Sequence, residues 1–174
     1  MTSSARSKTV TGRRVKDVAL LKLSIDEAMG RFIPKKDSTG AVVETYCNFG
    51  TNHVLKAFGF KEFVGLVANE IVNRLATHPY FGKVDAEAAQ RLALDGQVVI
   101  AGRKAEGHGH VALVYPKKDP MPISGKWKKP VPWIGNVGKR NEVFGANFAF
   151  GEEPCYYALV RDIPSDGGAG QDKA

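Results

Sequence analysis

The chain has 174 residues, 43% of them hydrophobic and 25% charged, and its formal charge is +7. This length and composition predict one globular domain with its own core, and two cysteines are too few for a disulfide framework. No apolar run approaches the length of a membrane span. The positive charge favours contact with a polyanion, such as nucleic acid, anionic lipid head groups or an acidic wall polymer, without choosing among them.

The two ends of the chain have the composition of flexible segments. Residues 1–14 are basic and rich in Ser and Thr, and residues 164–174 include a glycine-rich stretch, so both are predicted to be disordered. One domain is predicted over residues 15–163. No apolar stretch follows the basic start, so we expect synthesis in the cytoplasm without a signal peptide, with release only by non-classical export or by lysis.

Helices are predicted first, from apolar positions at helical spacing and from capping residues. Ser24 and Glu27 form a capping box that restarts the first helix, Thr45 caps the second, and Asp85 caps the fourth. The predicted helices cover residues 15–32, 46–58, 63–76 and 86–94, with a polar loop at 34–40. Strand-like runs follow at 97–101, 110–115, 131–137 and 155–161. This order predicts an α+β fold with N-terminal helices and a C-terminal antiparallel sheet.

Cys47 opens the second predicted helix and is the candidate nucleophile. A helix N-terminus lowers the pKa of a thiol, and its unpaired N–H groups can hold the oxyanion of a tetrahedral intermediate. The alternative is that Cys47 is a small buried hydrophobic residue. A disulfide to Cys155 is disfavoured, because the two cysteines lie in unlike local patterns.

His110 starts an apolar strand and is the expected base and acid for Cys47. It shares one face of that strand with Ala112, whose small side chain leaves room for the Cys47 helix. His108 has the same parity and is the competing candidate, although two flanking glycines leave its backbone less fixed. The alternative for His110 is a hydrogen-bonded structural histidine.

Asn136 is the candidate to hold the second nitrogen of the imidazole, because its predicted strand can pair beside that of His110. The surrounding Gly-Asn-Val-Gly sequence also fits a chain reversal, in which Asn136 would be a turn residue. Asn141 and Asp119 are weaker options. No set of His, Cys, Asp and Glu has zinc spacing and no glycine loop opens a helix, so neither metal nor cofactor is expected.

Several segments, taken in order, resemble the NlpC/P60 and CHAP cell-wall amidases. Tyr46-Cys47-Asn48 at a helix start is similar to their nucleophile helix, and Gly109 to Val114 to their histidine strand. The resemblance spans about residues 40–161. Gly50 is an unusual residue so early in a helix, and the first predicted helix has no clear counterpart. Further similar segments are Ala68-Asn69, 89–100, 134–138, 148–150 and 155–157.

The resemblance implies a papain-like α+β fold and metal-free thiol hydrolysis of peptide or amide bonds in peptidoglycan. It implies Cys47 as nucleophile, His110 as base and Asn136 as the residue that orients the base. Backbone or side-chain groups of Tyr46 and Cys47 would form the oxyanion hole. Substrate contacts are assigned to Trp133, Trp127 and His108, with core packing as the alternative for the tryptophans.

The expected partner is peptidoglycan, together with an immunity protein or secretion machinery if the chain is a delivered toxin rather than a phage lysin. A monomer that binds no nucleic acid is expected. Two other functions remain open: a basic nucleic-acid-binding module, supported by the charge and by Lys126-Trp127-Lys128-Lys129, and a catalytically inactive wall-binding domain on the same fold.

Overall fold

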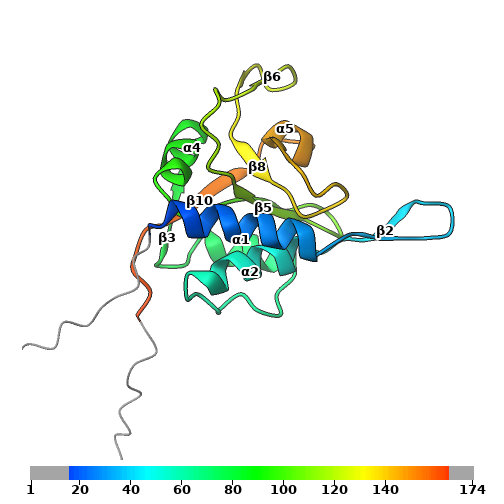
Figure 1. The fold of residues 1–174 in the computed structure, drawn as a ribbon, viewed down its shortest axis with the longest axis horizontal. Coiled ribbons are helices and arrows are strands. Elements are labelled where there is room, and N and C mark those ends of the chain that lie inside the picture. Colours follow the sequence, from blue (N-terminus) through cyan, green and yellow to red (C-terminus); the bar gives the residue numbers. More distant parts are fainter. Residues whose placement is uncertain (1–15, 165–174) are drawn as a thin grey trace, which may run out of the picture.

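A six-stranded antiparallel sheet with strand order β3-β10-β4-β5-β8-β9 carries the other elements (Figure 1). The computed structural model describes residues 16–164; the predicted flexible N-terminus and all but Pro164 of the predicted tail lie outside them. The strands of this sheet are β3 (Phe81–Val84), β4 (Val99–Arg103), β5 (His110–Val114), β8 (Trp133–Gly135), β9 (Val143–Gly145) and β10 (Cys155–Leu159).

Helices and two small hairpins complete the fold. The prediction of an α+β fold with an antiparallel sheet is confirmed, but β3 lies between two helices in the chain, so helices and strands do not form two separate blocks. No helix between residues 16 and 164 is long and apolar enough to cross a bilayer. The helices are α1 (Val18–Arg31), α2 (Cys47–Ala57), α3 (Ala68–Leu75), α4 (Ala86–Leu94) and α5 (Ala146–Ala149); the hairpins are β1–β2 (Lys35–Lys36, Val42–Glu44) and β6–β7 (Ile123–Ser124, Lys129–Pro130).

Of the three predicted helix caps, one is confirmed and two are wrong. Asp85 caps α4 by accepting from the N–H of Ala88 at 2.8 Å, as predicted. The predicted restart of the first helix is wrong: the buried Ser24 hydroxyl donates to the Leu21 carbonyl, and α1 continues without a break. Thr45 does not cap α2, whose N-cap residue is Tyr46 without a side-chain hydrogen bond.

The third helix is shorter than predicted, because the residues predicted to form its first turn belong to an aromatic cluster instead. Phe63 is fully buried, and its ring lies 4.7 Å from that of Phe60 and 5.7 Å from that of Phe81, between ring centroids. Residues 62–65 form turns around this cluster, and α3 begins at Ala68. Burial of three large rings stabilises the segment more than continued helix would.

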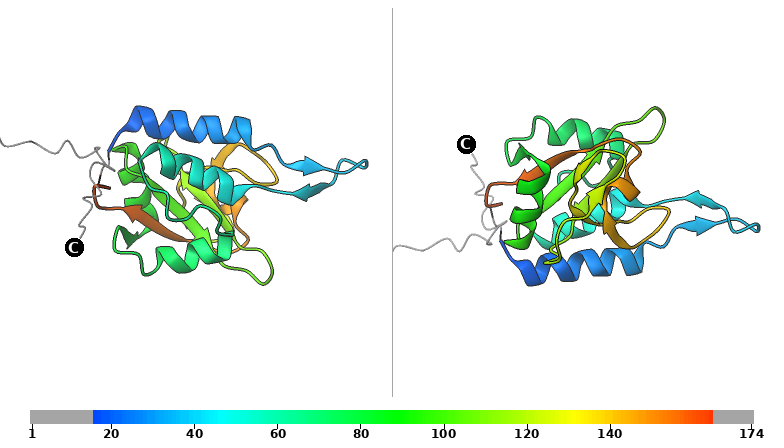
Figure 2. Two further views of the ribbon diagram at one scale, coloured as in Figure 1. Left: turned by 90° about the horizontal axis from the view of Figure 1, so that it is seen from below. Right: turned by 90° about the horizontal axis from the view of Figure 1, so that it is seen from above.

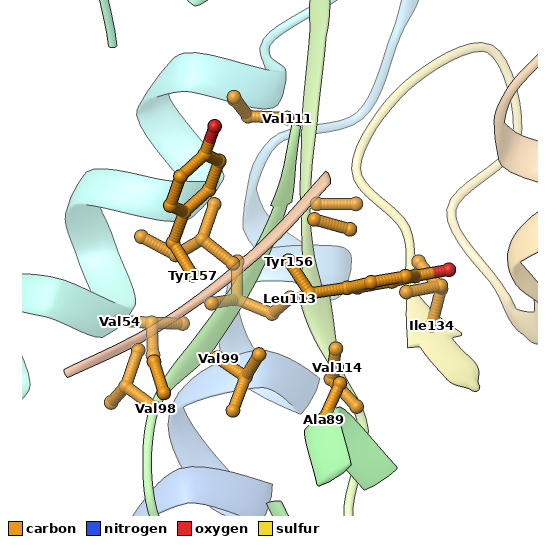
Figure 3. Packing of buried hydrophobic residues seen from close by; sticks show 14 of the residues in the cluster. Val54, Ala89, Val98, Val99, Val111, Leu113, Val114, Ile134, Tyr156 and Tyr157 are labelled. Atoms are coloured by element: carbon orange, nitrogen blue, oxygen red, sulfur yellow. The ribbon is translucent and has the colours of Figure 1, made fainter. Parts of the chain in front are cut away.

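Helices cover both faces of the sheet. The side chains of Tyr156 and Tyr157 point to opposite faces of the sheet. Tyr157 is on the face that carries Val54 of α2, and Tyr156 is on the face that carries Ala89 of α4 (Figure 3). The Ile134 side chain of β8 is on the same face as Tyr156. The β1–β2 hairpin projects from the body of the molecule beyond the end of α1 (Figures 1 and 2). The core therefore lies on both sides of the central strands, and the hairpin extends past it.

Gly50, the unusual residue early in α2, marks a close approach between helix and sheet. A Cβ atom built on Gly50 would lie 2.7 Å from Cγ2 and 2.9 Å from Cβ of Val137, the second residue after β8. A larger side chain would therefore push the start of α2 away from this segment. The glycine keeps the N-terminal turn of α2 against the sheet.

Gly50→Ala is expected to destabilise the fold by about 1–3 kcal/mol through overpacking, even though alanine is the better helix former. The matched control is Gly30→Ala in α1, where a Cβ would meet nothing within 4 Å. That change should leave stability unchanged or raise it by about 0.5–1 kcal/mol. Urea unfolding midpoints measure both, and equal effects of the two substitutions would contradict the packing argument.

Candidate active site

Segments far apart in the sequence line a cleft of about 630 Å³. They are β2, the first turns of α2 and α3, the β4–β5 loop, and Lys139 from the β8–β9 loop. Cys47 and His108 lie in the wall. Side chains more than half exposed make part of the wall apolar: Val43, Phe49 and Val67.

Cys47 is the first residue of α2, and only 8% of its surface is exposed. Because no side chain caps α2, the N–H groups of its first turn are left for other acceptors. The N–H groups of Cys47 and Asn48 lie at the Cys47 sulfur, and so does that of Val111 on β5. The thiol is thus surrounded by backbone donors from a helix start and a strand start.

Two opposing effects set the pKa of Cys47. Burial raises the pKa because it removes solvent from the thiolate, whereas the N–H groups of Val111, Asn48 and Cys47 lower it. Burial is the larger effect, so the pKa lies above its usual value. The expectation that the helix N-terminus would lower this pKa overall is wrong, and Cys47 is a protonated thiol at neutral pH.

His110 is the first residue of β5, and Asn136 holds its ring. Nε2 of His110 lies 2.7 Å from Oδ1 of Asn136. The Asn136 amide is fixed in orientation, because its Nδ2 donates at 2.7 Å to the carbonyl oxygen of Arg140, which can only accept. Oδ1 therefore accepts from the ring, so neutral His110 carries its proton on Nε2 and leaves Nδ1 as the basic nitrogen.

The His110 ring is uncharged at neutral pH. Burial lowers its pKa, and the hydrogen bond to Asn136 opposes this with a smaller raising effect. The ring also packs against Phe150, with 5.0 Å between centroids. Asn136 follows β8 directly, and its backbone N–H donates to the Glu142 carbonyl across the β8–β9 turn. Asn136 is therefore a residue of a chain reversal, as one interpretation predicts. Its side chain also binds the imidazole, as the other interpretation predicts.

The Cys47 sulfur lies at the backbone N–H of Val111, the residue that follows His110 on β5. Within residues 16–164 no hydrogen bond joins the thiol to the imidazole, and the His110 ring is not part of the cleft wall. The structure therefore brings His110 and Asn136 together, whereas the Cys47 sulfur contacts backbone N–H groups, among them that of the residue that follows His110. A contact between a catalytic thiol and its imidazole often forms only when substrate is bound.

The β4–β5 loop that leads to His110 is held by Asn69 of α3. Its Nδ2 donates to the Ala105 carbonyl at 2.9 Å, and its Oδ1 accepts from the Ala105 N–H at 3.2 Å. A Cβ built on Gly109 would lie 2.1 Å from this Oδ1. Only glycine lets the chain pass so close to α3, and this fixes where His108 and His110 lie. His108 is exposed in the cleft wall and remains the second candidate base.

The remaining predicted residues divide between the cleft and the rest of the fold. Tyr46 lines the cleft, and burial and then Glu44 raise its pKa, so it keeps a phenolic proton to donate. Trp127 and Trp133 do not line the cleft; both pack against the core, and Trp133 donates from Nε1 to the Asp119 carbonyl at 3.2 Å. Cys155 is a free cysteine, so no disulfide forms with Cys47.

The weaker candidates for orienting the base have structural roles. The Asn141 amide donates to the carbonyls of Met29 and Phe32, both at 2.9 Å, and accepts from the N–H of Gly138. It ties the β8–β9 turn to the end of α1. The side chain of Asp119 pairs with Lys117 at 3.7 Å. Neither contacts His110.

Sequence reasoning missed the β2 wall of the cleft and the role of Asn69. The hairpin had a local signal: Oδ1 of Asp37 accepts from the N–H groups of Thr39 and Ala41, and Gly40 has φ +85°. An Asp-x-Thr-Gly turn before a β-branched run is typical of a hairpin. Asn69 had no such signal, because its partner lies 36 residues away.

Neither the protein-family models nor the curated proteins compared with this chain match it. The likeness to cell-wall amidases therefore depends on the short sequence motifs alone. No group of three or more His, Cys, Asp or Glu side chains in residues 16–164 could hold a metal ion.

Alkylation of Cys47 by iodoacetamide should be slow at pH 7 and should rise with an inflection above about 8.5, the value of an ordinary thiol, because burial raises its pKa. Cys155→Ser leaves Cys47 as the single thiol for this measurement. A rate that has already reached its plateau at pH 7 would show that an ion pair with His110 outweighs burial.

Asn136→Leu should lower the pKa of His110 further, because the hydrogen bond that favours the charged ring is lost. An NMR titration of the His110 ring in the wild type and in the variant measures this change. An unchanged His110 titration would show that Asn136 does not set the state of the ring.

Proposed function

We propose that the protein is a cysteine hydrolase that cleaves peptide or amide bonds, with Cys47 as nucleophile and His110 as base. The single observation that carries this is the hydrogen bond from His110 to an Asn136 amide of fixed orientation, close to a thiol at an uncapped helix start. A histidine that only stabilised the fold would not need a fixed tautomer with Nδ1 left unbonded.

The chemistry follows from the uncharged resting pair. As the Cys47 sulfur attacks the carbonyl carbon, the thiol proton passes to Nδ1 of His110 and the carbonyl π electrons move to oxygen. The N–H groups of the first turn of α2 stabilise this oxyanion. His110 then protonates the leaving amine as the C–N bond breaks, and later deprotonates the water that releases the acyl group from sulfur.

We further propose that the fold is papain-like and of the NlpC/P60 and CHAP type. The motifs that carry the resemblance fall on α2, β5 and β8, and the elements meet at the proposed site. The substrate class proposed is peptidoglycan stem peptides, because that is the class the resemblance implies and because the net charge of +7 favours an anionic wall.

A second candidate is a catalytically inactive wall-binding domain on this fold. Two observations favour it: burial raises the pKa of Cys47, and the thiol forms no hydrogen bond with the His110 ring in residues 16–164. Such a domain would bind purified wall without releasing new amino termini. The two candidates therefore differ in product, not in binding.

Incubation with purified peptidoglycan should release new amino termini, and Cys47→Ala should reduce the rate to background. His110→Ala should lower it by about 10²–10⁴-fold, the usual contribution of a general base. Cys155→Ser is the matched thiol control and should leave the rate unchanged, since Cys155 lies outside the cleft wall. Retained activity in Cys47→Ala would refute the mechanism.

His108→Ala decides between the two histidines. If His110 is the base, this change in the cleft wall should alter substrate affinity and leave the acid limb of the pH–rate profile in place. That limb should lie below the ordinary histidine value of about 6.5, because burial lowers the pKa of His110. Loss of the acid limb in His108→Ala would transfer the role to His108.

A further inference from the structure

One end of the molecule, separate from the cleft wall, combines exposed apolar side chains with lysines. It is formed by the β6–β7 hairpin and α5 (Figure 1). The residues that precede them lie close together, since a Cβ on Gly145, the residue before α5, would lie 2.9 Å from Cγ of Pro122, the residue before β6. Ile123 is 69% exposed and Phe148 is 68% exposed, the highest values among the large hydrophobic side chains of residues 16–164.

The lysines of this end carry a local excess of positive charge. Lys117 pairs with Asp119, and Lys129 pairs with Glu153, so the neighbouring carboxylates are already neutralised. Lys118, Lys126 and Lys128 are exposed, and none of the three forms an ion pair within the described part of the chain. They are available to an external anion.

The apolar side chains favour a lipid surface over nucleic acid as the source of that anion. Single-stranded nucleic acid is held by bases stacked on open aromatic faces. Here Trp127 packs against the core, and the Lys117 ammonium lies 4.2 Å from the ring centroid of Trp133 and covers it. Phe148 is then a single exposed ring rather than a row of stacking faces, and Ile123 offers no face for stacking. Exposed apolar side chains beside lysines are suited to the boundary between head groups and acyl chains.

We propose that this end, defined by Lys118, Ile123, Lys126, Lys128 and Phe148, binds the surface of an anionic phospholipid bilayer. The lysines contact phosphate groups, and the two apolar side chains enter the interface. Binding there leaves the cleft of Cys47 uncovered, because none of these residues lines it. The inference does not rest on the proposed hydrolase activity.

Sedimentation with vesicles tests the proposal on the full chain. Binding is expected to vesicles of phosphatidylglycerol with phosphatidylcholine, and not to phosphatidylcholine alone. Lys126→Gln with Lys128→Gln should weaken binding about tenfold or more. Ile123→Ser with Phe148→Ser should weaken it without changing the charge.

The matched control is Lys35→Gln with Lys36→Gln, which removes the same charge from exposed residues of the β1–β2 hairpin. It should bind vesicles like the wild type, and Cys47→Ala should as well. Equal losses in the two lysine pairs would show binding by net charge alone and would overturn the proposal. So would binding to a single-stranded oligonucleotide, but not to vesicles, that depends on Lys126 and Lys128.

Discussion

The close packing of the start of α2 against the start of β5 is the contact on which the rest of the site depends. Gly50 lets α2 approach Val137, and Gly109 lets the β4–β5 loop pass against Asn69. Both approaches leave no room for a Cβ atom. As a result the Cys47 sulfur meets the N–H of Val111, one residue from His110. Without these two contacts the helix start and the strand start would separate, and the thiol and the imidazole would lose their common environment.

The same packing sets the charge state of the site. Burial raises the pKa of the Cys47 thiol and lowers that of the His110 imidazole, so both groups are uncharged at rest. Backbone N–H groups and the Asn136 amide oppose these shifts without reversing them. In the proposed hydrolase, Cys47 would become a nucleophile only as its proton moves to Nδ1 of His110. The fixed tautomer of His110 then matters more than the pKa of the free thiol.

The sequence allowed part of this to be predicted because some signals are local. Asp85 and the apolar run that begins at His110 gave an N-cap and a strand at the positions found, and the motif around Cys47 located a helix start. The predictions failed where a side-chain hydrogen bond or a packing contact overrides the local pattern. Ser24 bonds backward inside α1, and Phe63 is drawn into a ring cluster with Phe60 and Phe81. Thr45 does not cap α2, because the helix begins one residue later and its N-cap residue is Tyr46.

The sequence by itself determined the α+β class, the two candidate reactive side chains, Cys47 and His110, and the excess of positive charge, since these depend on composition, periodicity and residue type. Only the tertiary structure decided that Asn136 faces His110 with its carbonyl oxygen, because the Arg140 carbonyl fixes the amide. It also decided that burial outweighs the helix N-terminus at Cys47, because desolvation depends on how many distant segments close around an atom.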